Sequence, residues 1–405
     1  MGSETTFDRR YVFAAMLVSL LLFSFVSMQC SDSGSNPTQP GDTLSTGDDD
    51  STDDSTGDST AELFTVSPLP CDSIKEIVVL GNLNPTGHVY PTDHVYWYLP
   101  IDEGSSTPDL VTLYCPGTIL LTRATIQENV TQAVTDYSLE FTLASGVYFS
   151  FGHVSSLSTS IFGDVSGKEG FTLQEEYSTG GNTYRTWARD YSLTVTAGAV
   201  LGTAGGNQGQ YALDLNLYDW NQTIGEPAND TIWQWSRQVH ALCPLDQFEP
   251  GAVRDSLWDL VSRTAPPGDD YPCGSAMQDV AATAQGIWFK PGESAPYPED
   301  PHLALVWHNI DASNQAFSVG NSIPTISSGV YTFTPNESGR LNRRFDQVTS
   351  DGNIYGYLVY YYGAGEMTML VELTDSVTMK IEGILGHVSD STSWSFTEAA
   401  TTFQR

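Results

Sequence analysis

Residues 137–143 read YSLEFTL and residues 147–151 read VYFSF, and only Ala144, Ser145 and Gly146 separate the two stretches. Apolar and aromatic side chains alternate with polar ones in both, which is typical of β-strands with one buried face. The Gly-containing interruption between them is typical of a turn. This part of the chain therefore predicts β-structure.

The same pattern extends through most of the chain in two series. Residues 250–263 separate them, because their apolar side chains follow helical spacing behind a proline and predict one short helix. The sequence therefore predicts an all-β fold with two β-rich domains, at 63–245 and 246–405. The second domain is expected to be a β-sandwich or a barrel-like domain. The other predicted strands are 76–80, 94–99, 111–114, 191–195, 212–218 and 232–235, then 284–289, 303–307, 330–333, 354–362, 367–373 and 377–382.

The N-terminus has the layout of an exported protein. Arg9 and Arg10 precede an apolar run over residues 11–28, and Cys30 follows. Residues 1–30 thus predict a signal peptide or an uncleaved membrane helix, with a lipid on Cys30 as the alternative means of attachment. Residues 31–62 carry nine acidic side chains and no basic one, which favours a disordered, self-repelling linker. We expect the globular part to be displayed outside the membrane, at the cell surface or periplasmic face.

Charge and cysteine content narrow the possible partners and stabilising links. The whole chain has a net charge of −33, which disfavours nucleic acid as a partner. Beyond Cys30 there are four cysteines, and an exported chain with an even number permits two disulfides in three pairings. The four are Cys71, Cys115, Cys243 and Cys273.

Histidines near the start of one predicted strand are the first candidates for chemistry. Residues 87–94 read GHVYPTDH, so His88, Asp93 and His94 lie close together in the chain. Imidazole and carboxylate groups together suit zinc. The alternative is that these histidines are hydrogen-bonded structural residues.

Four later segments, in order, resemble motifs of the lysostaphin-type (LytM-like) peptidoglycan metalloendopeptidases. Residues 113–119 (LYCPGTI) are similar to the family's Ala-Pro-x-x-Gly-x-Val strand and turn, and residues 151–158 (FGHVSSLS) to its Tyr-x-His-Leu-Ser segment. Residues 197–206 (AGAVLGTAGG) resemble its Gly-x-x-Ile-Gly-x-x-Gly turn, and residues 212–217 (ALDLNL) stand where its His-x-His-Phe-Glu strand would be. The resemblance covers roughly residues 80–220.

This resemblance implies a site. His88, His94 (or its neighbour Asp93) and Asp214 would be the zinc ligands, and His153 a catalytic histidine. Ala212 occupies the position of the family's other catalytic histidine. Loss of a group that orients water or stabilises an oxyanion can cost about 10²–10³ in rate.

Three functions remain open from the sequence. The first is a cell-envelope protein that binds a peptidoglycan-like or peptide ligand, through zinc, with weak or no hydrolysis. The second is a working zinc metalloendopeptidase of cell-wall peptides that uses His153. The third is a metal-free surface adhesin or scaffold in which the histidines belong to the core.

Overall fold

The computed structural model describes residues 64–405, except 86, 180–181, 234–235, 265–271, 294–295, 362–364 and 388–393. The predicted signal or anchor (1–30) and linker (31–62) lie outside the described residues. Among the helices of the described part, none has the length and apolar character needed to cross a membrane.

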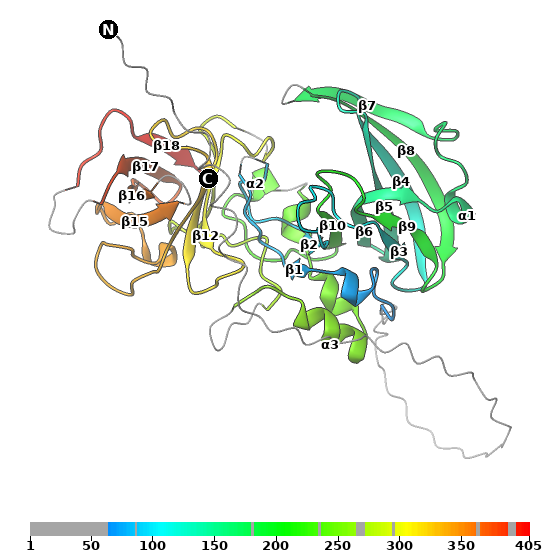
Figure 1. Cartoon of the computed structure of the whole chain (residues 1–405). Helices are drawn as coiled ribbons and strands as arrows, with labels where there is room; N and C mark the ends of the chain where they lie inside the picture. The colour runs from blue at the N-terminus through cyan, green and yellow to red at the C-terminus, as the bar shows by residue number, and fades with distance from the viewer. Residues whose placement is uncertain are drawn as a thin grey trace, which may run out of the picture.

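Two antiparallel sheets make up most of the described chain and lie side by side (Figure 1). The prediction of an all-β protein with two β-rich parts is confirmed. The first sheet has ten strands in the order β1-β2-β10-β6-β5-β4-β8-β7, with β9 joining β3 to β6. Its strands are β1 (Glu76–Val78), β2 (Val95–Tyr98), β3 (Val111–Tyr114), β4 (Ile119–Asn129), β5 (Val134–Ala144), β6 (Val147–Leu157), β7 (Thr172–Thr179), β8 (Asn182–Val195), β9 (Val200–Ala204) and β10 (Ala212–Asp219), with the short helix α1 (Thr159–Phe162) after β6.

The second sheet has eight strands that follow one another in chain order. Backbone hydrogen bonds of 2.8 and 2.9 Å between Phe289 and Gln404 join its first strand to its last, which gives it a barrel-like form. Its strands are β11 (Gly286–Trp288), β12 (Leu303–Trp307), β13 (Gln315–Val319), β14 (Gly329–Phe333), β15 (Tyr355–Tyr361), β16 (Gly365–Leu373), β17 (Thr378–Leu385) and β18 (Thr401–Gln404), with the 3-10 turn η5 (Phe345–Gln347) after β14.

Short helices connect the two sheets. They are α2 (Asp230–Trp233), the 3-10 turns η3 (Arg237–His240) and η4 (Pro244–Gln247), and α3 (Ala252–Asp259). The helix expected within 250–263 is α3, and its Leu257 packs into the core of the first sheet. The strand expected at 232–235 is wrong for its described residues, because Ile232 and Trp233 belong to α2. The Asn229 side chain accepts a hydrogen bond from the Ile232 N–H at 3.2 Å and so starts that helix.

One disulfide is formed among the described residues, between Cys243 and Cys273. It ties η4 to the segment that leads into the second sheet. Cys115 is a buried thiol whose pKa is raised by burial to about 12, so it stays protonated at neutral pH. Of the two disulfides that the cysteine count permits, the described residues thus show one.

Candidate functional site

Strand β10 places Asp214 on the face of the first sheet opposite the core. Leu213 and Leu215 are fully buried in the core, so the alternation of a strand turns Asp214 to the other face. Asp214 pairs with Tyr96 of β2 on one side and with Gly152 of β6 on the other. A carboxylate is therefore held centrally on this face, with 13% of its side chain exposed.

His153 reaches the same place through a β-bulge. The register between β5 and β6 shifts between Tyr137 and Leu139, so Gly152 and His153 together oppose one residue of β5. His153 has a φ of 59°, a left-handed conformation that is uncommon for residues other than glycine. Bulges of this kind redirect side chains and are frequent next to functional sites.

Gly152 gives the Asp214 side chain its room. A Cβ atom at residue 152 would lie 3.3 Å from Cβ and 3.5 Å from Oδ2 of Asp214. A side chain there would press on Cβ of Asp214, which would have to move by a few tenths of an ångström.

Two imidazole nitrogens converge on one oxygen of Asp214. Nε2 of His94, the residue just before β2, lies 3.7 Å from Asp214 Oδ2, and Nε2 of His153 lies 3.4 Å from the same atom. The structure thus brings together three of the four residues that the sequence places in the site, from β10, from β6 and from the start of β2.

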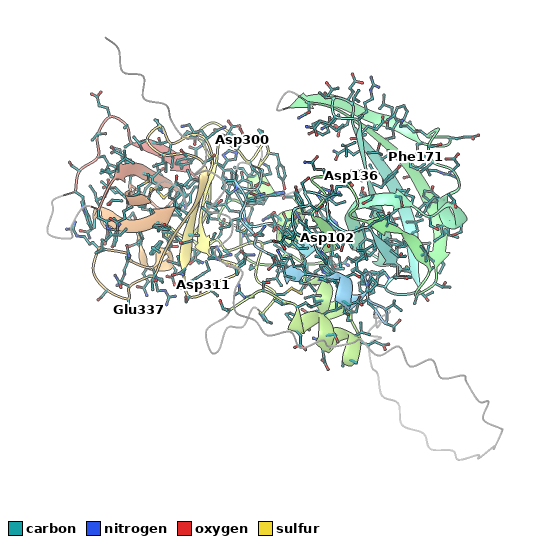
Figure 2. All side chains as sticks on the ribbon, viewed as in Figure 1. Asp102, Asp136, Phe171, Asp300, Asp311 and Glu337 are labelled. Carbon is teal, nitrogen blue, oxygen red and sulfur yellow. A yellow bond between two sulfur atoms is a disulfide. The ribbon has the colours of Figure 1, made fainter. Side chains whose placement is uncertain are left out.

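Each of these imidazoles donates its other ring nitrogen to a second carboxylate. Nδ1 of His94 donates to Asp93 Oδ1 at 3.0 Å, and Nδ1 of His153 donates to Asp136 Oδ2 at 2.7 Å. Figure 2 shows Asp136 on the side of the first sheet that is turned toward the second. Metal-binding histidines commonly donate their other nitrogen to a carboxylate in this way, which fixes the ring and its tautomer.

Three polar atoms of the site are buried and have no hydrogen-bond partner. They are Nε2 of His94, Oδ1 of Asp214 and Oδ1 of Asp136. Unsatisfied buried polar groups are costly and uncommon in folded proteins. A ligand or metal ion bound between these side chains would satisfy them.

The carboxylates favour the protonated form of both histidines. Burial lowers the pKa of His153, but the hydrogen bond to Asp136 and the charge of Asp214 outweigh this effect and raise the pKa to about 9. Burial likewise lowers the pKa of His94, and the hydrogen bond to Asp93 and the charge of Asp214 outweigh it, so that this pKa is raised. A metal ion must therefore displace protons in order to bind here.

His88 lies at the edge of this group. Its ring packs edge-on against the ring of His94, with 5.4 Å between centroids, and its Nδ1 lies 3.8 Å from Glu299 Oε1. Glu299 comes from the segment before β12 and also accepts the Tyr90 N–H at 2.9 Å. His88 thus faces a carboxylate of the second sheet region.

Ala212 lies on β10 two residues before Asp214 and pairs with Tyr98 of β2. It is buried, with 7% of its surface exposed. A methyl group at this position can neither orient water nor stabilise negative charge.

The spacing of the converging atoms is close to what zinc requires. With ligand bonds of about 2.0–2.1 Å, neighbouring atoms of a tetrahedral zinc shell lie roughly 3.4 Å apart. The distance from His153 to Asp214 matches this value, whereas the 3.7 Å from His94 is wider. In the part of the chain that the structure describes, no group of three or more His, Cys, Asp or Glu side chains is placed so that it could hold a metal ion. The 3.7 Å between His94 and Asp214 would have to shorten before zinc could bind all three side chains.

No family model, curated protein or solved structure matches this chain.

Proposed function

We propose that this chain is a cell-envelope protein whose first sheet is a divergent LytM-like domain that binds a peptidoglycan-like or peptide ligand at a zinc site, with weak or no hydrolysis. The observation that carries the proposal is the convergence of His94, His153 and Asp214, with a second carboxylate behind each imidazole.

The geometry supports His153 in place of His88 as the third ligand. His153 Nε2 lies near the shared oxygen of Asp214, whereas His88 has its Nδ1 near Glu299. Two imidazoles and one carboxylate are a sufficient protein shell for zinc, and they leave a fourth position for a ligand. Zinc bound there would polarise a carbonyl oxygen as a Lewis acid.

Weak or absent hydrolysis follows from what surrounds these ligands. The family to which the sequence is similar uses two histidines to assist the attacking water. Here Ala212 replaces one, and His153 is used as a ligand in this arrangement. The site then retains groups that bind and orient a carbonyl but no imidazole to move a proton.

The metal content of the purified chain from residue 63 onward tests this proposal. We expect about one zinc per chain after equilibration with buffered zinc at pH 8, and none in His94→Ala. His387→Ala is the matched control, because His387 lies at the end of β17 beside Glu366 and should leave the zinc content unchanged. A wild-type chain that remains metal-free would remove zinc from the proposal.

The alternative function is a working zinc endopeptidase, and His153 is the observation that favours it. Its 47% exposed side chain is the most accessible of the three converging groups, and it is paired with Asp136. That function requires cleavage of cell-wall peptides that a chelator stops and that His153→Ala abolishes. Binding of peptides without cleavage supports the function proposed above.

A further inference from the structure

A cavity of about 370 Å³ lies beside the candidate zinc site on the same face of the first sheet. It is lined by residues of β5, β6 and β10 and of the segment that follows β10: Glu140, Tyr148, Phe149, Ser150, Tyr218, Trp220 and Arg237. Small-ligand sites have volumes of about 300–1,000 Å³. The cavity is thus large enough for a short piece of a bound peptide.

Arg237 is the charged group that distinguishes this cavity. It begins η3, its side chain is exposed, and its guanidinium lies over the Tyr218 ring, 5.5 Å from the centroid. Burial lowers the pKa of Arg237, but the Tyr218 hydroxyl and the charges of Glu140 and Asp93 outweigh this effect and raise it. Within the described residues Arg237 nevertheless forms no direct ion pair with a carboxylate, so its guanidinium keeps N–H donors that a ligand carboxylate can accept.

Two exposed aromatic rings provide the walls. Trp220 is 38% exposed and is held in place by His240, whose ring centroid lies 4.3 Å away. Tyr148 is 42% exposed and pairs across the strands with Tyr218. Such rings supply apolar contact area for the part of a ligand that carries the carboxylate.

The cavity and the zinc site are physically connected. The Tyr218 hydroxyl lies 3.1 Å from Asp93 Oδ2, and Asp93 Oδ1 accepts the hydrogen bond from His94. Along β6, Ser150 in the cavity is two residues from Gly152, which corresponds to about 7 Å in a strand. An extended peptide with a carbonyl at the zinc site would reach Arg237 with its next one or two residues.

We infer that the ligand is a peptide with a carboxylate-bearing residue, and that this residue binds in the cavity with its carboxylate on Arg237 and its body between Trp220 and Tyr148. This inference rests on the proposed function for the position of the rest of the peptide. Glu140, on the β5 wall, disfavours a second acidic group in the same ligand residue.

The test compares two peptides that differ only in charge, acetyl-Ala-Glu-Ala-amide and acetyl-Ala-Gln-Ala-amide, by calorimetric titration of the zinc-equilibrated chain. Hydrogen bonds to a charged group contribute about 1.5–3 kcal/mol, so the Glu peptide should bind at least about tenfold more tightly. Arg237→Gln should remove this preference. Arg254→Gln on α3, where the arginine is paired with Asp246 at 3.5 Å, is the matched control and should keep it.

A second variant covers the case in which Arg237→Gln disturbs the fold. Trp220→Ala should weaken both peptides together and leave their ratio unchanged. Equal affinity of the two peptides for the wild type, no binding of either at millimolar concentration, or a preference that survives in Arg237→Gln would overturn the inference.

Zinc content separates this inference from the proposed function. Arg237→Gln should bind as much zinc as the wild type, because Arg237 does not contact the three converging side chains. If the chain binds no zinc but still prefers the Glu peptide through Arg237, the zinc site is wrong and the inference about the cavity stands. If the chain binds zinc but shows no preference for the Glu peptide, the zinc site stands and the inference about the cavity is wrong.

Discussion

His153 combines an uncommon backbone conformation with a strongly perturbed side chain. Its pKa is raised from 6.5 to about 9, because the hydrogen bond to Asp136 and the charges of Asp214 and Asp136 outweigh burial. A pKa raised on folding stabilises the protein fully below the unfolded value, and this contribution is lost as the pH rises through the folded value. The metal-free protein should therefore lose stability between about pH 6.5 and pH 9.

The size of this loss is limited by solvent. The side chain is 47% exposed, so screening should hold the effect to about 1 kcal/mol or less. Urea unfolding at pH 6, 7.5 and 9 in the presence of a chelator measures it. His153→Asn is the control, because asparagine tolerates a positive φ but does not titrate. Identical pH dependence in the variant and the wild type would contradict this account of His153.

At the scale of single residues, the sequence named His94, His153 and Asp214, and these three converge. It did not name Asp136, which lies on β5, 17 residues before its partner His153. Nothing in the local sequence marks Asp136, because the contact arises only from strand pairing and from the bulge at Gly152 and His153. Arg237 was not named for a similar reason, since η3 reaches this face only through the fold.

The pairing of β6 with β10 places Gly152 directly against Asp214. Gly152→Ala tests this directly, since the added Cβ would lie 3.3 Å from Cβ of Asp214. We expect the carboxylate to be displaced by a few tenths of an ångström. Displacement of one ligand should lower zinc affinity about tenfold or more while the fold persists, in line with the sensitivity of metal sites to their supporting residues.

Competition with a fluorescent zinc chelator measures that affinity, and thermal unfolding checks the fold. Gly167→Ala is the matched control, because nothing lies within 4 Å of the position that its Cβ would take. Unchanged zinc affinity in Gly152→Ala would show that Asp214 does not depend on this close approach.

At the scale of elements, alternation was sufficient to predict most strands around the site, but not all strands of the sheet. β4 was not predicted, and its register shifts between Leu121 and Arg123, which interrupts the alternation that a pattern search uses. Residues 197–206 were interpreted as a turn, yet they contain β9. In that strand Gly202 packs so closely on Ser156 that a Cβ would lie 1.8 Å from its carbonyl oxygen. Close backbone packing of this kind depends on tertiary structure, and the glycine is its only sign in the sequence.

On the scale of the whole molecule, a buried apolar cluster joins the second sheet to the loop before β2 and to the short helices between the sheets. It contains Val89, Tyr90, Trp233, Val239, Met277, Ile287, Phe289, Ala304 and Val306. Tyr90 belongs to the loop that leads to Asp93 and His94, and Phe289 and Ala304 belong to the second sheet region. The second sheet therefore supports the loop that carries one wall of the candidate site.

Tyr90 tests whether the two sheets fold as one unit. Its ring is 1% exposed, stacks on His302 with 5.8 Å between centroids, and its hydroxyl donates to the Pro296 carbonyl at 2.7 Å. Removal of a buried aromatic side chain costs about 3–5 kcal/mol. We expect the wild type to unfold in a single calorimetric transition and Tyr90→Ala to unfold in two, the first at a lower temperature.

Tyr360→Ala, on β15 with 58% of the residue exposed, should leave the transition unchanged. Two well-separated transitions in the wild type would mean that the sheets are independent, and the zinc site would then be formed by the first sheet alone.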